Sequence, residues 1–472
     1  MEGFLERRHK PYQAVRSLAD SAIEEQMISE GKLPELITFK KVERRLPFTF
    51  GPSSGICVPS SDNSSLPVHR WFRFKESFSG DLLKNVVEVY ARELGKTFRF
   101  LDPFCGVGTS LVTAQELSAC GFHVNAIGIE RNPFIAFVAR TKVSWPEINP
   151  DRISELGASL LTNSSDGRVS LPRLSSVKDG RCISQYLARR IVAIRNSIRR
   201  DGYTPTHDAL LLGLGATVEP VSRVRKDGRA LRLVDRARPH FERTLRDKWQ
   251  LISADVHFFQ NTLQGTPIPL VIVGDGRVPS KYAIKPGSVD LIVTSPPYPN
   301  NIDYSEVYKL ELWLLGFIED AHSFLQLRYS TFRSHPTCST PDPPIAFLAE
   351  LKRGALRGLL APLLQRVDQM PRCWRRRLLI GYFSDMWRSL GEFYECLRPG
   401  GLAIIVVGNS LHNGTRSPYV IPTDLALATI GKCVGFEVES VAVVRSLKRR
   451  LSGNHYLRES IIVLRKADGS RD

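Results

Sequence analysis

Apolar residues in this chain fall into two recurring patterns, short continuous runs and segments with helical spacing. Strands are expected over 98–104, 126–130, 268–275, 288–295, 397–410, 438–446 and 459–466, and 268–275 and 288–295 are near-continuous apolar runs, as is typical of strands covered on both faces. Helical spacing covers 81–95, 109–119 and 133–143. Strands that alternate with helices in this way predict a parallel sheet in an α/β, doubly wound domain.

Two segments interrupt this alternation and divide the chain. Sixteen Lys and Arg stand against seven Asp and Glu in 181–248, which is more than half of the chain's excess positive charge. A second interruption is a helical section near 320–390. We therefore expect four parts: an N-terminal arm or linker over 1–65, with a helix over 18–31; a first α/β part over 66–145; a basic, mainly helical insertion over 146–265; and a second α/β part over 266–472.

Composition narrows the class of protein. The 472 residues are 42% hydrophobic and 24% charged, values of an ordinary globular chain, and the net charge is +17. Such an excess favours a polyanionic partner, most simply nucleic acid. The chain contains no run of about 18 apolar residues, so we expect no membrane span. The start of the chain lacks the apolar core of a signal peptide. The 8 cysteines form no CxxC pair, so we expect a cytoplasmic protein with reduced thiols, no metal site and no membrane partner.

A glycine-rich turn follows the first predicted strand. The segment Asp102-Pro-Phe104-Cys105-Gly106-Val-Gly108-Thr109 stands between a strand and a helix. Glycines let a backbone approach a ligand closely, and the helix start offers free N–H groups to an anion. Leu111 replaces the third glycine of a dinucleotide motif, which argues against NAD or FAD. A tight turn without a ligand explains this segment equally well.

Acidic residues end the next two strands. Glu130 stands 22 residues after Gly108, a spacing typical of a carboxylate that binds ribose hydroxyls. Asp275, followed by Gly276, ends the next strand and is a candidate acceptor for an adenine amino group.

The fourth strand ends in Ser295-Pro296-Pro297-Tyr298. Two prolines fix two φ angles and remove two N–H donors, which leaves a stiff segment rich in acceptors. Such a segment can accept hydrogen bonds from an exocyclic amino group, and Tyr298 offers a flat face on which a base can stack. Taken alone, a proline turn with a core tyrosine is the simpler interpretation.

Together these motifs resemble those of the AdoMet-dependent amino-group DNA methyltransferases, of the N4-cytosine or N6-adenine type. Phe104–Gly108 matches that family's FxGxG cofactor loop, and 295–298 matches its [DNS]PPY catalytic loop. The resemblance implies a Rossmann-like class I sheet of seven strands, the last antiparallel. It also implies that Phe78 and Ser79 contact the methionine part of AdoMet.

The resemblance further implies an activity. A serine before the two prolines leans towards cytosine N4, and no cysteine follows a proline as in typical C5-methylating enzymes. Ser295 and the Pro296 carbonyl would accept hydrogen bonds from a flipped base stacked on Tyr298. Double-stranded DNA is the implied partner, with a cognate restriction endonuclease in a restriction–modification setting. Candidate DNA contacts in the insertion are Arg223, Arg225, Lys226 and Arg229.

Three alternatives stay open at this stage. One is an N6-adenine DNA methyltransferase, and another is an RNA methyltransferase acting on guanine N2, whose loops are similar. The third is a basic DNA-binding protein without catalysis. Asn301, Asp303 and Tyr304 follow the catalytic loop and either shape the pocket or cap a helix.

Overall fold

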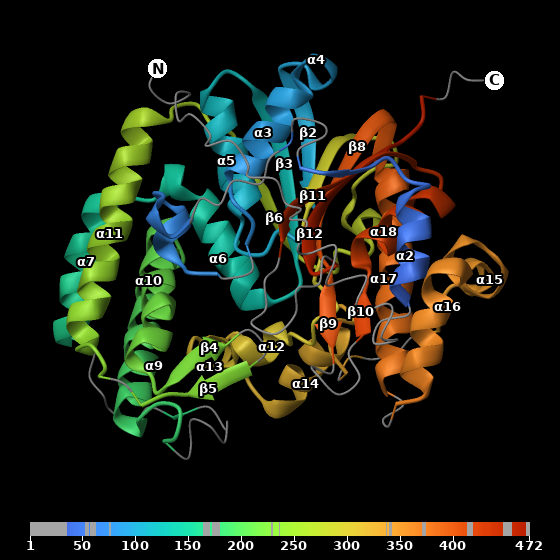
Figure 1. Cartoon of the computed structure of the whole chain (residues 1–472). Coiled ribbons are helices and arrows are strands. Elements are labelled where there is room, and N and C mark those ends of the chain that lie inside the picture. Colours follow the sequence, from blue (N-terminus) through green and yellow to red (C-terminus); the bar gives the residue numbers. More distant parts are fainter. Residues whose placement is uncertain are drawn as a thin grey trace.

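A mixed sheet of eight strands forms the centre of the computed structural model (Figure 1). The structure describes residues 35–51, 56, 63–74, 77–163, 170–171, 180–227, 230–235, 237–336, 338, 342–370, 374–412, 419–446 and 456–468. The strand order is β1-β11-β12-β8-β7-β2-β3-β6. In that order the strands are β1 (Phe48–Phe50), β11 (Glu437–Ser446), β12 (Arg458–Arg465), β8 (Leu397–Gly408), β7 (Val289–Thr294), β2 (Thr97–Asp102), β3 (His123–Glu130) and β6 (Leu270–Val273).

The strands of this sheet are parallel with one exception. Strand β2 pairs in parallel with β3 and β7, and β3 with β6 and β7 with β8 are also parallel. Only the last strand, β12, runs antiparallel, against both β8 and β11. This arrangement confirms the expected α/β fold and its antiparallel last strand, and all seven predicted strands are present.

The eighth strand, β1, corrects the assignment of 1–65 to an arm or linker. It pairs in parallel with β11 at the sheet edge. Helix α2 (Glu35–Glu43) precedes it, and Leu36 and Phe39 of that helix are fully buried. Residues 35–50 therefore belong to the main domain, while the helix expected over 18–31 lies outside the described residues.

Helices cover both faces of the sheet because strand side chains alternate between them. Phe98 and Phe100 of β2 belong to one hydrophobic core, and Leu101 to the other. Helices contributing to the first core include α3 (Asp81–Val89), α5 (Thr109–Ala119) and α6 (Pro133–Val143), with α4 (Ala91–Leu94) between α3 and β2. The second core includes α16 (Ala355–Asp368), α17 (Trp374–Cys396) and α18 (Thr423–Cys433).

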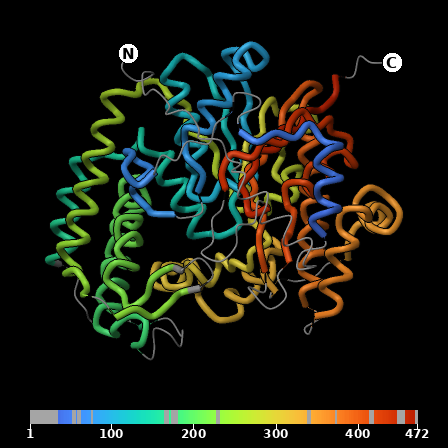
Figure 2. Tube along the Cα trace, viewed as in Figure 1, coloured from blue at the N-terminus to red at the C-terminus, as the bar shows by residue number. Residues whose placement is uncertain are grey.

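The basic insertion is mainly helical, and it shares the first core. Its helices are α7 (Pro150–Asn163), α9 (Gln185–Asp201), α10 (Pro205–Val221) and α11 (Phe241–Thr262), with a hairpin of β4 (Val224–Asp227) and β5 (Ala230–Leu233). A Cβ at Gly215 of α10 would stand 3.2 Å from the ring of Phe134 on α6. The chain trace shows this green insertion and the orange helices on opposite sides of the sheet (Figure 2).

Shorter elements follow the catalytic loop. They are α12 (Tyr304–Val307), α13 (Lys309–Leu314), α14 (Ala321–Ser330) and α15 (Ile345–Arg353), followed later by the small pair β9 (Ser410–His412) and β10 (Tyr419–Ile421). Among the described residues, no helix combines the length and apolar character that a bilayer crossing requires.

Candidate active site

One cavity lies at the carboxyl ends of the parallel strands. This is where ligands bind in doubly wound sheets. The cavity brings together most of the predicted site residues, from segments up to about 200 positions apart. The predicted residues that line it are Phe78, Phe104, Cys105, Gly106, Thr109, Glu130, Asp275, Gly276, Ser295 and Pro297.

The glycine-rich turn forms one wall of the cavity. Gly106 and Gly108 have φ angles of 52° and 77°, which favour glycine, and α5 begins directly after Gly108. The Cys105 N–H donates to the carbonyl of Ile129 on β3 at 3.0 Å. A Cβ at Gly276 would stand 1.8 Å from the carbonyl oxygen of Pro103. Two backbone segments thus meet closely at the cavity, which requires glycine at 276.

Asp102 supports this turn from below and does not line the cavity. Its carboxylate accepts hydrogen bonds from the Phe104 N–H at 3.1 Å and from the Thr294 hydroxyl at 2.7 Å. The Ser110 hydroxyl also donates to it. Burial raises the pKa of Asp102 to about 6, although these hydrogen bonds oppose the shift. Asp102 therefore positions the turn against the catalytic strand, and its predicted role in cofactor binding stays a prediction.

Glu130 stands at the rim, at the end of β3. One carboxylate oxygen accepts from the Asn132 N–H at 2.7 Å. Asn132 in turn caps α6 and accepts from the Phe134 N–H at 3.1 Å. Burial raises the pKa of Glu130 to about 7. The carboxylate is thus fixed in place by its neighbours while it faces the cavity, as expected for a hydroxyl acceptor.

Asp275 is held by an arginine that follows it in the chain. Arg277 donates to both carboxylate oxygens of Asp275, with Nη2 2.8 Å from Oδ2 and Nε 2.9 Å from Oδ1. Burial acts to raise the pKa of Asp275, but the hydrogen bonds and charge of Arg277 outweigh it and keep the pKa below its ordinary value. Asp275 lines the cavity as an ionised acceptor, and both of its carboxylate oxygens already accept hydrogen bonds from Arg277.

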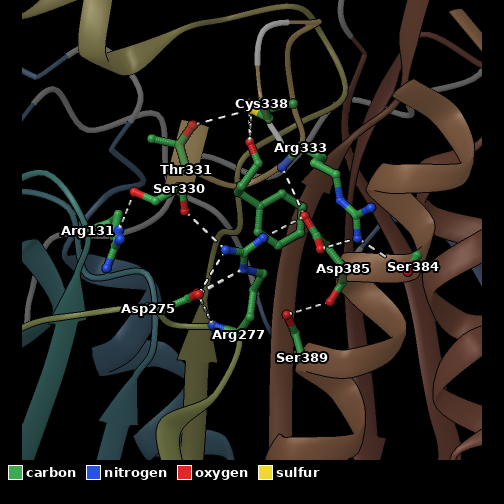
Figure 3. Close-up of polar contacts among 12 residues, drawn as sticks. Arg131, Asp275, Arg277, Ser330, Thr331, Arg333, Cys338, Ser384, Asp385 and Ser389 are labelled. Carbon is green, nitrogen blue, oxygen red and sulfur yellow. Dashed lines mark hydrogen bonds and ion pairs between the residues drawn. The ribbon is translucent and has the colours of Figure 1, made fainter. Parts of the chain in front are cut away.

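Asp385 of α17 joins this pair to a segment across the cavity (Figure 3). It accepts from Nη1 of Arg277 at 3.1 Å and from the Arg333 N–H at 3.0 Å, and it also accepts from the Arg333 guanidinium. Arg277 reaches the Ser330 carbonyl at 3.1 Å, and Arg131 donates to the Ser330 hydroxyl at 3.0 Å. These contacts hold the 330–335 segment over the cavity, a wall that the sequence did not reveal.

The catalytic loop contains a chain of hydroxyl groups. The Ser295 hydroxyl donates to the Tyr298 hydroxyl at 3.1 Å, which donates to Oε1 of Glu459 at 3.3 Å. Glu459, from β12, also pairs with Arg445 at 2.9 Å. Burial, followed by the charge of Glu459, raises the pKa of Tyr298.

Tyr298 and Pro296 do not line the cavity, in contrast to Ser295 and Pro297. The Tyr298 ring packs against the second core. Base stacking by Tyr298 requires this ring to reach the cavity, so that role stays a prediction.

Neighbouring segments refine the predicted site. Phe78 lines the cavity together with Ser77, which we did not predict, whereas Ser79 is buried and accepts from the Asp81 N–H at 3.2 Å. Asp303 caps α12, and Tyr304 lines the cavity. The residues after the catalytic loop therefore both cap a helix and line the cavity.

The predicted basic contacts divide into two kinds. Arg223 and Arg225 are exposed, whereas Lys226 is buried and forms ion pairs with Glu311 and Glu219. A buried, paired ammonium does not reach a phosphate, so the assignment of Lys226 as a DNA contact is wrong. Arg229 lies outside the described residues.

Two curated proteins resemble the chain over most of their length. One is the "Type II methyltransferase M.AvaI" of Nostoc sp., 28% identical over 445 residues, with 86% of this chain and 87% of that protein covered. The other is the "Type II methyltransferase M.BsoBI" of Geobacillus stearothermophilus, 23% identical over 452 residues, with 86% of each covered. The chain is similar to type II methyltransferases.

Other comparisons add less. No family model matches the chain. Among solved structures, the rRNA methyltransferase aviRa from Streptomyces viridochromogenes has 12% sequence identity and a TM-score of 0.30, and the alignment covers 88% of this chain and 96% of that one.

Proposed function

We propose that this chain is a site-specific DNA methyltransferase that transfers a methyl group from AdoMet to the exocyclic N4 amino group of cytosine. The observation that carries the proposal is the position of Ser295. Ser295 lines the same cavity as the glycine-rich turn and Glu130. An amino-group acceptor and a nucleoside-binding carboxylate thus share one space. The similarity to two type II methyltransferases along most of the chain supports DNA as the substrate.

The cavity suits AdoMet. Glu130 offers a carboxylate oxygen for ribose hydroxyls, and Asp275 offers an acceptor for the adenine amino group. The first turn of α5 and the close backbone approach at Gly276 suit the methionine end and the flat adenine. AdoMet would supply a sulfonium methyl group: the amine nitrogen would bond to that carbon as the carbon–sulfur bond breaks, S-adenosylhomocysteine would leave, and the methylated nitrogen would lose one proton to solvent. No metal ion and no covalent protein intermediate are needed for this step.

Ser295 prepares the amine for this attack. The lone pair of a cytosine amino group is delocalised into the ring, which makes the nitrogen a weak nucleophile. Hydrogen bonds accepted from its N–H groups localise that lone pair. Because the Ser295 hydroxyl donates its proton to Tyr298, its own lone pairs stay available to the amine. The loop therefore supplies a preoriented acceptor, and position and electrostatics do most of the catalytic work.

Glu459 sets the direction of this hydroxyl chain, so we treat it as a positioning residue. An ionised carboxylate only accepts, so Tyr298 must donate to Glu459 and accept from Ser295. In Glu459→Leu nothing fixes the direction of the hydrogen bond between Ser295 and Tyr298, so the Ser295 hydroxyl can donate its proton towards the base. One misdirected hydrogen bond is worth about 1 kcal/mol, so we expect kcat to fall about fivefold, with the KM for AdoMet unchanged.

Glu459→Gln is the matched control for this prediction. It loses the ion pair with Arg445 just as leucine does, but it keeps a carbonyl acceptor for Tyr298. We expect kcat in single-turnover assays to stay within threefold of wild type. Equal losses in both variants would assign the effect to the ion pair instead.

The raised pKa of Glu130 predicts a pH-dependent affinity for AdoMet. Ribose hydroxyls donate to the ionised carboxylate, so binding favours the deprotonated form and strengthens as pH rises through about 7. Between pH 6 and pH 8 the ionised fraction of such a group rises about tenfold. We expect the association constant from titration calorimetry to rise by that factor, whereas Glu130→Gln removes this dependence and binds more weakly at pH 8. A wild-type profile identical to that of the variant would contradict the role of Glu130.

Nucleoside mass spectrometry tests the function. Purified protein is incubated with unmethylated genomic DNA, or with RNA in parallel, and AdoMet carrying a labelled methyl group. We expect labelled N4-methylcytosine in DNA, formed far more slowly with the Ser295→Ala variant. Labelled N6-methyladenine would keep the mechanism and overturn the choice of base. Label in RNA alone would overturn the DNA assignment, and AdoMet-independent DNA binding without label would leave a binding protein.

In a restriction–modification setting, such an enzyme protects DNA from a cognate endonuclease. The base must leave the duplex to reach Ser295, at a cost of a few kcal/mol. Contacts to the DNA backbone must offset that cost.

A further inference from the structure

We propose that the β4–β5 hairpin is a DNA-binding ribbon that enters a groove beside the target base. This inference rests on the proposed function and names the surface that holds the DNA. It starts from the alternation of side chains along β4. Val224 and Lys226 face inward and are buried, whereas Arg223, before the strand, and Arg225 face solvent. The hairpin therefore has an inner, anchored face and an outer, basic face.

The outer face presents exposed basic side chains. Arg225 stands directly opposite Arg232 in the antiparallel pair, and both are exposed. Neither Arg223 nor Arg225 pairs with an acidic side chain among those that the structure describes. The charges of Arg223 and Arg225 are therefore available to an anionic partner.

The inner face fixes the hairpin to the active site. The Lys226 ammonium pairs with Glu311 of α13 and lies 4.4 Å from the centre of the Tyr308 ring. Its backbone N–H donates to Glu219 of α10 at 3.0 Å. Strand β5 packs against α12, whose first residue, Tyr304, lines the cavity. Figure 1 shows the hairpin beside α12 and α13, below the sheet. The basic face is thus held rigidly near the catalytic loop.

The shape of the hairpin favours duplex DNA over RNA as the partner. The major groove of B-form DNA admits a two-stranded ribbon, and arginine pairs there with guanine O6 and N7 or with phosphates. The major groove of A-form RNA is too deep and narrow for side chains to read. The buried lysine contributes to binding only indirectly, by holding the ribbon in place.

The test compares two double variants with the same change in charge. Arg223→Ala/Arg225→Ala removes two arginines from the outer face. Arg92→Ala/Arg152→Ala removes two exposed arginines from α4 and the start of α7, far from the hairpin. The probe is a fluorescent duplex with the sequence that the wild-type protein methylates, found by sequencing methylated genomic DNA. Anisotropy gives the affinity at several salt concentrations, and calorimetry gives AdoMet binding.

We expect the hairpin variant to bind the duplex at least tenfold more weakly, with a salt slope lower by about 2. AdoMet binding stays unchanged, which shows that the variant is folded. The control variant stays within twofold of wild type. Unchanged affinity of the hairpin variant, or equal loss in both variants, would overturn the inference. Failure of the proposed function is a separate result, in which the wild-type protein itself neither binds AdoMet nor methylates DNA.

Discussion

Replacing Ser295 with alanine is expected to lower kcat about 10²–10³-fold while AdoMet binding stays unchanged. This is the range measured when one preorganised hydrogen bond to a transition state is removed. Ser295 lines the cavity, and its proton is directed to Tyr298, so the alanine variant loses an acceptor that no neighbour replaces. Single-turnover rates with labelled AdoMet measure the loss, and calorimetry measures the binding of AdoMet.

Ser288→Ala serves as the matched control for this prediction. Ser288 is half-buried in a turn before β7, and its hydroxyl donates to the Lys285 carbonyl. The Ser288→Ala variant also loses a serine hydroxyl, but one that does not line the cavity, so the rate of this variant should equal that of the wild type. A Ser295→Ala rate within threefold of wild type would show that the amine is activated elsewhere.

Asp385→Asn is expected to lower the free energy of unfolding by about 3–5 kcal/mol, the usual cost of removing one partner from a buried ion pair. The side chains of Asp385 and Arg333 are 2% and 5% exposed, and that of Arg277 is 13% exposed. With a neutral amide in place of the carboxylate, two arginines lose their shared anion in the interior. Urea unfolding measures the free energy.

An exposed ion pair provides the comparison. Asp368 pairs with Arg376, and both side chains are more than 40% exposed. We expect Asp368→Asn to cost 1 kcal/mol or less, as is usual for surface pairs. Similar costs for the two aspartates would mean that solvent already screens the Asp385 cluster. Because Arg277 also holds Asp275, we further expect Asp385→Asn to weaken AdoMet binding.

Much of the sheet was predictable because its strands are buried on both faces. The helices over 109–119 and 133–143 have the predicted bounds. The three-residue strand β1 was missed, since so short a segment has no pattern of its own and forms by pairing with β11, almost 400 residues later.

The site was predictable only where a residue follows a strand. Glu130 and Ser295 are identified by that position and line the cavity as expected. Asp385 and Glu459 act through partners 52 to 161 positions away, and no spacing rule reveals such contacts. Lys226 was misassigned because a basic run does not show which side chains point inward until the strand is placed.

The shared core between α6 and the insertion limits how target preference can change in evolution or by engineering. Modular recognition domains can be exchanged as units, whereas here the ring of Phe134 fits against Gly215, where a Cβ would be 3.2 Å from that ring. Transplanting residues 146–265 from a relative would place a foreign surface against the helix that follows Glu130. With the outer hairpin face reading DNA as proposed, substitutions on that face would change specificity without disturbing this core, while a whole-segment graft must bring its matching α6.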